Sequence, residues 1–164
     1  MKKGYLIMIC IVCIFILLFG CVNHFEDDRD LKCRISIDCT TILDNMDNLD
    51  PDKYEMVPED GFILSPCEVS FTEGESLYDV LMNVTMEYGI HVESNFTPVY
   101  NSAYIEGIGN LYEFDCGELS GWTYIVNGEA LNKGCSSYEV KAGDIIEWRY
   151  TCNLGRDIGI EWVE

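Results

Sequence analysis

The chain has 164 residues, and its 29 acidic against 10 basic side chains give a formal net charge of −19. Nucleic-acid phosphates require clusters of Lys and Arg, so this charge balance excludes a nucleic-acid-binding protein. Hydrophobic residues make up 48% of the sequence, which argues against intrinsic disorder and is enough for one domain with a packed core.

The N-terminal region predicts an exported protein. Lys2 and Lys3 precede an apolar run over residues 5–19. A membrane span needs about 20 apolar residues, so a run of this length is more typical of a signal peptide. The alternatives are an uncleaved anchor helix and a plainly secreted protein.

The segment Leu18-Phe19-Gly20-Cys21 resembles the lipobox of bacterial lipoproteins, although Phe19 is bulkier than the small residue usual there. This resemblance implies cleavage before Cys21 and a diacylglycerol on its sulfur. Two acyl chains give stable attachment to a membrane. We therefore expect a protein of the bacterial cell envelope, anchored by lipid on the extracytoplasmic side of the membrane.

On this basis the chain divides into four parts. Residues 1–20 are the expected lipoprotein signal peptide, 21–31 a tether, 32–158 one folded domain and 159–164 a C-terminal tail. The tether contains the run Glu26-Asp27-Asp28-Arg29-Asp30, which is typical of a solvated spacer.

Two strands and a long loop are expected at the start of the domain. Residues 33–39 and 68–72 alternate between apolar and polar side chains, as half-buried strands do. Residues 40–66 between them are rich in Asp, Asn and Pro and predict a loop.

The acidic part of this loop, residues 44–60, is superficially similar to a calcium-binding loop. An EF-hand that began at Asp44 would need an oxygen ligand where Met46 stands and a glycine where Leu49 stands. We therefore predict a solvated acidic loop and no metal site, with a calcium site of another kind as the alternative.

One helix is predicted over about residues 76–88. Ser76, followed three residues later by Asp79, resembles a capping box, and Gly89 is a natural C-terminal stop. The apolar side chains repeat at the spacing of one helical face, at Leu77, Val80, Leu81, Val84 and Tyr88.

Further strands are expected at 90–93, 122–126 and 145–151, with a glycine-punctuated segment over 104–114. Asn127-Gly128 predicts a tight turn. This order of elements describes an α+β domain in which a mixed sheet packs on the one main helix.

Candidate ligand-binding residues lie on two of these strands. Along a strand, Trp122 and Tyr124 point to one face and Thr123 to the other. If the Trp face is outward, its rings form a platform for a planar or ring-shaped ligand, whereas an inward face makes them core packing. The full candidate set is Ser120, Gly121, Trp122, Thr123, Tyr124, Trp148 and Tyr150.

The sequence offers little for catalysis. His24 lies in the tether, so His91 is the sole histidine of the expected domain. Any nucleophile–histidine arrangement would have to be built around it. We predict that the protein is not an enzyme and requires no cofactor.

Four segments together resemble a known family. They are residues 41–47, 102–108, 117–128 and 144–150, with Ser-Gly-Trp, Val-Asn-Gly and Gly-Asp as their most specific motifs. They are similar to the bacterial domain related to the C-terminal domain of transcobalamin and intrinsic factor. The resemblance implies a β-grasp fold of the soluble-ligand-binding type. In the animal proteins a second, helical domain completes the cobalamin site, and we expect none in this chain.

Together with the lipobox-like segment, this resemblance implies an extracytoplasmic, lipid-anchored module that binds a soluble ligand, with cobalamin or a related corrinoid as the candidate. The alternative is a cell-surface module that binds another protein or a glycan and takes no small-molecule ligand.

The nine cysteines sort by expected compartment. Cys10 and Cys13 leave with the signal peptide, Cys21 carries lipid, and the remaining six are expected to form up to three disulfides. One pair flanks the predicted hairpin, and a second ends two strands that a β-grasp places side by side and parallel. The expected pairs are Cys116 with Cys135, Cys39 with Cys152, and Cys33 with Cys67.

Overall fold

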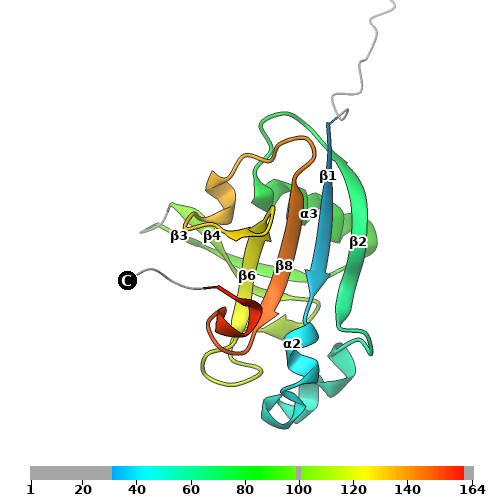
Figure 1. The fold of residues 1–164 in the computed structure, drawn as a ribbon, viewed down its shortest axis with the longest axis vertical. Helices are drawn as coiled ribbons and strands as arrows, with labels where there is room; N and C mark the ends of the chain where they lie inside the picture. The colour runs from blue at the N-terminus through cyan, green and yellow to red at the C-terminus, as the bar shows by residue number, and fades with distance from the viewer. Residues whose placement is uncertain (1–30, 99–100, 161–164) are drawn as a thin grey trace, which may run out of the picture.

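The computed structural model describes residues 31–98 and 101–160, which form a large sheet, a small sheet and a long helix (Figure 1). The expected signal peptide, the lipidation site Cys21 and the tether up to residue 30 lie outside the described residues. The strands are β1 (Leu31–Asp38), β2 (Phe62–Phe71), β3 (Val92–Thr97), β4 (Ser102–Ile108), β5 (Leu111–Tyr112), β6 (Gly121–Val126), β7 (Glu129–Ala130) and β8 (Ile145–Thr151). The helices are α2 (Thr40–Leu43), η1 (Met46–Asn48), η2 (Pro51–Met56), α3 (Leu77–Tyr88), η3 (Cys135–Ser137) and η4 (Arg156–Ile158).

The large sheet has five strands in the order β2-β1-β8-β6-β7. β1 and β8 run parallel, with Ile35 opposite Ile146, while β2 pairs antiparallel with β1 and β6 antiparallel with β8. The predicted mixed sheet is therefore confirmed. The sheet brings the first and last strands of the described chain side by side, as Figure 1 shows.

The predicted helix is α3, and its local signals act as expected. The Ser76 side chain accepts a hydrogen bond from the Asp79 amide at 3.2 Å, and the Asp79 carboxylate accepts one from the Ser76 amide at 2.9 Å. Gly89 ends the helix in the left-handed conformation at φ 68°. In Figure 1 the helix lies behind the large sheet. In the described part of the chain, no helix has the length and apolar character needed to cross a membrane.

The small sheet, β3-β4-β5, packs against the inner side of the large sheet. Two aromatic side chains of the large sheet donate hydrogen bonds to backbone carbonyls of the small sheet. The Trp122 indole donates to the Leu111 carbonyl at 2.8 Å, and the Tyr150 hydroxyl donates to the Tyr112 carbonyl at 2.7 Å. The core therefore continues from α3 along the inner face to β5.

Residues 40–60, which we call the acidic segment, differ from the loop predicted for them, because they contain α2, η1 and η2. Leu49 is 3% exposed and anchors the segment in the core. The Asp50 carboxylate caps η2 by accepting from the Asp52 amide at 3.0 Å, and Lys53 Nζ lies 3.3 Å from Asp115 Oδ2. Local caps and a buried leucine thus order a stretch whose composition resembles a loop.

Strand β2 begins at Phe62, earlier than the strand predicted over 68–72. Pro66 lies inside it, in the segment whose Asp, Asn and Pro content predicted a loop. The large sheet ends at β2, and an edge strand tolerates a residue without an amide hydrogen.

The six cysteines of the described residues are all free thiols, and their neighbours differ from the expected pairs. Cys116 Sγ lies 3.4 Å from Cys152 Sγ. The parallel register places Asp38 opposite Arg149, so Cys152 lies two residues beyond the position opposite Cys39.

The third expected pair lies on β1 and β2, but its members are not opposite each other. Cys33 faces Val69, and Cys67 faces Ile35. Cys33 and Cys67 are therefore diagonal neighbours across the two strands and not a directly opposite pair.

Candidate ligand-binding site

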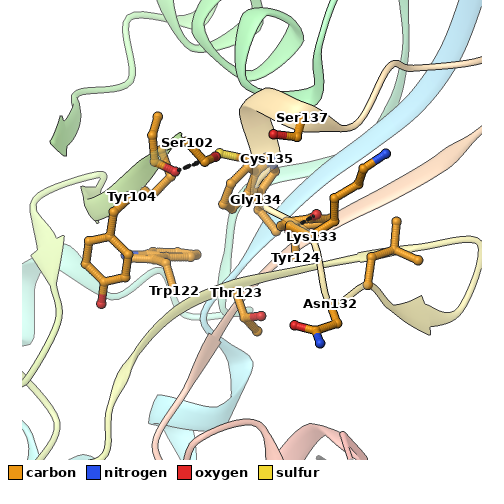
Figure 2. A pocket seen from close by; sticks show the side chains of 14 residues that line it. Ser102, Tyr104, Trp122, Thr123, Tyr124, Asn132, Lys133, Gly134, Cys135 and Ser137 are labelled. Carbon is orange, nitrogen blue, oxygen red and sulfur yellow. Dashed lines mark hydrogen bonds between the residues drawn. The ribbon is translucent and has the colours of Figure 1, made fainter. Parts of the chain in front are cut away.

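A hollow beside the aromatic strand β6 has a volume of about 620 Å³. One wall comes from β4 and β6, and the other from the segment that follows β7. Figure 2 shows Tyr104 and Trp122 on one side of this hollow and Lys133 on the other. We call it the first hollow.

Trp122 and Tyr124 line the first hollow, but most of each ring belongs to the core, and each side chain is 8% exposed. The Trp122 ring meets Tyr150 edge-on, with centroids 5.3 Å apart and an interplanar angle of 82°. The Tyr124 ring lies 5.5 Å from Trp148, and its hydroxyl donates to the Lys133 carbonyl. Burial raises the pKa of Tyr124 to about 12. The face of β6 that carries Trp122 and Tyr124 therefore points into the core, and only the edges of these rings border the first hollow.

The other predicted aromatics are more deeply buried, Trp148 at 2% and Tyr150 at 0% exposure. Besides its bond to β5, the Tyr150 hydroxyl lies 2.9 Å from Ser120 Oγ. Ser120 Oγ also accepts from the Cys116 amide at 3.1 Å and donates to the Gly117 carbonyl at 2.8 Å. Ser120 and Tyr150 thus shape the turn before β6 from inside the core.

Trp148 carries an unusual polar atom. Its indole N–H is the one buried side-chain nitrogen or oxygen without a hydrogen-bond partner among the described residues. A buried donor left unpaired costs about 1–3 kcal/mol. Trp148 also lines the first hollow.

The second wall of the first hollow was not predicted from the sequence. The Ala103 amide of β4 donates to Ser136 Oγ at 3.0 Å, and the Ser136 amide donates to Ser102 Oγ at 3.2 Å. A Cβ on Gly134 would lie 2.2 Å from Ser102 Oγ, so glycine permits this close approach. The run of small residues over 134–137 was the available sequence signal.

A second hollow of about 470 Å³ adjoins the first, and Tyr104, Trp122 and Thr123 line both. The Tyr104 hydroxyl donates to Glu113 Oε2 at 2.5 Å, and burial together with this carboxylate raises the pKa of Tyr104 to about 12. Gly121, another predicted site residue, also lines the second hollow. The two hollows thus meet along β6.

Exposed apolar side chains surround the second hollow. Phe114 is 62% exposed, Leu154 48% and Leu119 44%, and all three line it. Phe114 and Leu154 also have left-handed backbone angles, φ 70° and 50°. Bulky residues rarely adopt such angles, and strained backbone of this kind concentrates at functional sites. We call Tyr104, Phe114, Leu119 and Leu154 the apolar rim.

The outer edge of β6 is open between the hollows. Among the described strands, β7 pairs only with Ile125 and Val126, while the stretch from Gly121 to Tyr124 pairs with β8 alone. Backbone groups along an unpaired strand edge are available to an incoming partner. The site therefore combines ring edges, an apolar rim and a free strand edge.

The described residues do not form a cluster of metal-binding side chains. Across residues 31–98 and 101–160, no three His, Cys, Asp or Glu side chains converge as a metal ion would require. His91 is exposed, and its carbonyl accepts from the Gly109 amide.

Comparisons with known proteins support the fold. Residues 74–152 match the family model described as "Domain of unknown function (DUF4430)". The chain is similar to the crystal structure of haptocorrin in complex with Cbi, with 17% identity and a TM-score of 0.53, over 76% of this chain and 25% of that chain. It thus spans about a quarter of that protein, and its fold is transcobalamin-like.

A second solved structure is a protein of Ruminococcus gnavus ATCC 29149 for which metal binding has been suggested. It is 15% identical, with a TM-score of 0.46, over 74% of this chain and 97% of that chain. The comparison with curated proteins gave no match.

Proposed function

We propose that this domain is a β-grasp module that binds a ring-shaped soluble ligand, of which a corrinoid is the leading class. The observation that carries the proposal is the meeting of two hollows at Trp122 and Thr123, on the open edge of β6 and beside the apolar rim. Ligand sites combine a mostly apolar concave surface with a few polar groups that fix orientation. The haptocorrin structure, similar in fold, is a complex with Cbi.

The polar groups of the site suit a ligand that carries amides. The open edge of β6 offers backbone donors and acceptors, and Trp148 holds an unpaired indole N–H. A corrin ring with amide side chains brings both an apolar face and hydrogen-bonding groups. The ring would lie across the apolar rim while its amides bond to the strand edge.

We propose binding without a chemical step. Cys135 lines the first hollow, and burial raises its pKa, so at neutral pH it is a thiol and not a nucleophilic thiolate. No histidine is among the residues that line either hollow.

Titration of the purified full-length protein with cobinamide, followed by its visible spectrum and by calorimetry, tests the proposal. Saturable binding with one site per chain supports it. No heat, no spectral change and no co-elution would reject a corrinoid ligand.

A pair of exposed phenylalanines locates the binding surface. Phe114 is 62% exposed on the apolar rim, and Phe96 is 58% exposed and lines neither hollow. We expect Phe114→Ala to weaken cobinamide binding about 10-fold or more, since burial of an aromatic side chain contributes about 1.5–3 kcal/mol. Phe96→Ala should bind as the wild type does. Equal effects of the two substitutions would place the ligand elsewhere.

We also propose that the domain works outside the cytoplasm, tethered by lipid at Cys21. Support comes from the lipobox-like segment at residues 18–21. Mass spectrometry of the N-terminal peptide should show a diacylglyceryl thioether on Cys21, and Cys21→Ala should abolish it. A mature N-terminus other than Cys21 would exclude the lipoprotein assignment.

A cell-surface protein or glycan is the alternative partner of the same surface. The exposed apolar side chains favour a protein partner, because such patches on soluble domains mark interaction sites. This alternative is supported if the wild-type domain does not bind cobinamide and the Phe114→Ala substitution abolishes binding to a cell-surface protein or glycan.

A further inference from the structure

Two cysteines from distant parts of the chain meet at one end of the large sheet. Cys116 lies in the turn between β5 and β6, Cys152 directly follows β8, and their sulfurs are 3.4 Å apart. Cys116 is 3% exposed, and Cys152 is half-buried.

The surroundings hold both sulfurs in place. Cys116 Sγ lies 3.5 Å from the Asn45 carbonyl, and Cys152 Sγ lies 3.8 Å from Thr41 Oγ1. Thr41 Oγ1 in turn donates to the Tyr150 carbonyl at 2.7 Å. The pair thus sits where the acidic segment, the turn and the end of β8 come together.

We propose that Cys116 and Cys152 are an oxidation site that closes to a structural disulfide in an oxidising compartment. A disulfide S–S bond is about 2.0 Å long, so the sulfurs must approach by about 1.4 Å, which small side-chain rotations supply. The proposal concerns this pair alone and does not depend on the identity of any ligand.

The reaction needs an external oxidant, and a low-molecular-weight disulfide such as oxidised glutathione is sufficient. The Cys152 thiolate attacks one sulfur of that disulfide, and one thiol leaves. Cys116 then attacks the Cys152 sulfur of the mixed disulfide, forms the internal bond and releases the second thiol. The two protons lost by the cysteines go to the two released thiolates.

The chemistry of the pair indicates a structural link and not a redox catalyst. Burial raises the pKa of Cys152 to about 12, and burial also raises the pKa of Cys116. Catalytic thiols have the opposite property, a lowered pKa. Oxidation should therefore be slow at neutral pH and faster as the pH rises.

The bond would fix the second hollow. The turn that contains Cys116 also carries Phe114 and Leu119, while Leu154 lies just beyond Cys152. Closing the pair ties both sides of the apolar rim to each other. The rim would then be ordered before any partner arrives.

Peptide mapping after oxidation tests the assignment. The full-length protein is incubated with oxidised glutathione at pH 8.5, alkylated, and digested with trypsin and a Glu-specific protease. Under this cleavage Cys116 lies in the fragment 114–118 and Cys152 in the fragment 150–156. We expect these two fragments to be linked. Linkage of either cysteine to a different residue, or recovery of both as alkylated thiols, would overturn the proposal.

Thermal unfolding gives a second readout with a matched control. We expect oxidation to raise Tm on the order of 10 °C in the wild type, since a disulfide removes conformational freedom from the unfolded chain. Cys152→Ser should lose this rise, whereas Cys67→Ser, at another half-buried cysteine, should keep it. A rise retained in Cys152→Ser would show that another pair is responsible.

Discussion

Arg149 Nε lies 3.1 Å from Asp38 Oδ2, which joins the ends of the parallel strands β1 and β8. The Asp38 carboxylate also accepts from the Thr40 amide at 3.2 Å and from Thr40 Oγ1 at 2.8 Å, where α2 begins. Asp38 is 4% exposed. One buried carboxylate thus links the two central strands to the acidic segment.

We expect Asp38→Ala to lower the free energy of unfolding by about 2–4 kcal/mol, because it leaves Arg149 and Thr40 without their acceptor. The control is the ion pair of Lys32 and Glu68, which is 2.6 Å long but has side chains 60% and 64% exposed. Lys32→Ala should have a much smaller effect, because solvent screens an exposed ion pair. Urea denaturation measures both, and equal costs would contradict the role given to Asp38.

We expect that a side chain at Gly134 would destabilise the second wall of the first hollow. A Cβ there would lie 2.2 Å from Ser102 Oγ and 2.3 Å from Ser102 Cβ. Gly134→Ala should therefore destabilise the domain by about 1–3 kcal/mol and displace the wall. Gly121→Ala is the control, because its Cβ would meet Glu113 at an ordinary 3.5 Å. Denaturant midpoints that match for the two variants would disprove the close approach.

Buried tyrosines should make the domain sensitive to alkali. Burial raises the pKa of Tyr124 to about 12, whereas an unfolded tyrosine titrates near pH 10. Between these values the unfolded chain has released a proton that the native state retains, so stability falls as the pH rises from 10 to 12. A shift of this size corresponds to about 2–3 kcal/mol.

Unfolding of wild type and Tyr124→Phe, measured from pH 8 to 12, isolates this contribution. The variant lacks the titrating hydroxyl, so its stability should fall less steeply above pH 10. Parallel pH profiles would mean that Tyr124 does not titrate as its burial predicts.

Lys53 should hold the acidic segment against the rest of the domain. Its Nζ donates to the Asn110 carbonyl at 2.9 Å, lies 3.3 Å from Asp115 Oδ2 and sits 4.5 Å from the centre of the Tyr112 ring. We expect Lys53→Met to cost about 1–2 kcal/mol, and hydrogen exchange should speed up over residues 44–57. Lys141→Met, at an exposed lysine, should leave both unchanged. Unaltered exchange in Lys53→Met would contradict this anchoring.

The helix shows what local sequence signals can predict. The capping box of Ser76 and Asp79, the apolar repeat and Gly89 all lie within one short segment, and α3 begins and ends as they indicate. The loop predicted over residues 40–66 from their Asp, Asn and Pro content was wrong at its end, where β2 begins at Phe62 and includes Pro66. The place of β2 at the sheet edge makes a proline acceptable there.

The site was predictable in part. Residues 120–124 do border two hollows, but alternation along a strand leaves open which face is covered. The small sheet covers the face of β6 that carries Trp122 and Tyr124, so these two rings belong to the core and expose only their edges. The wall at 131–137 and the apolar rim come from segments with no periodic pattern to reveal them.

The sequence by itself determined the main helix, the mixed sheet expected from the order of elements, and the aromatic character of β6 and β8, because caps, turns and periodicity act over a few neighbouring residues. Only the tertiary structure decided that Trp122 faces inward and that Cys116 meets Cys152. These relationships depend on strand register and on packing between segments far apart in the chain, which local patterns do not specify.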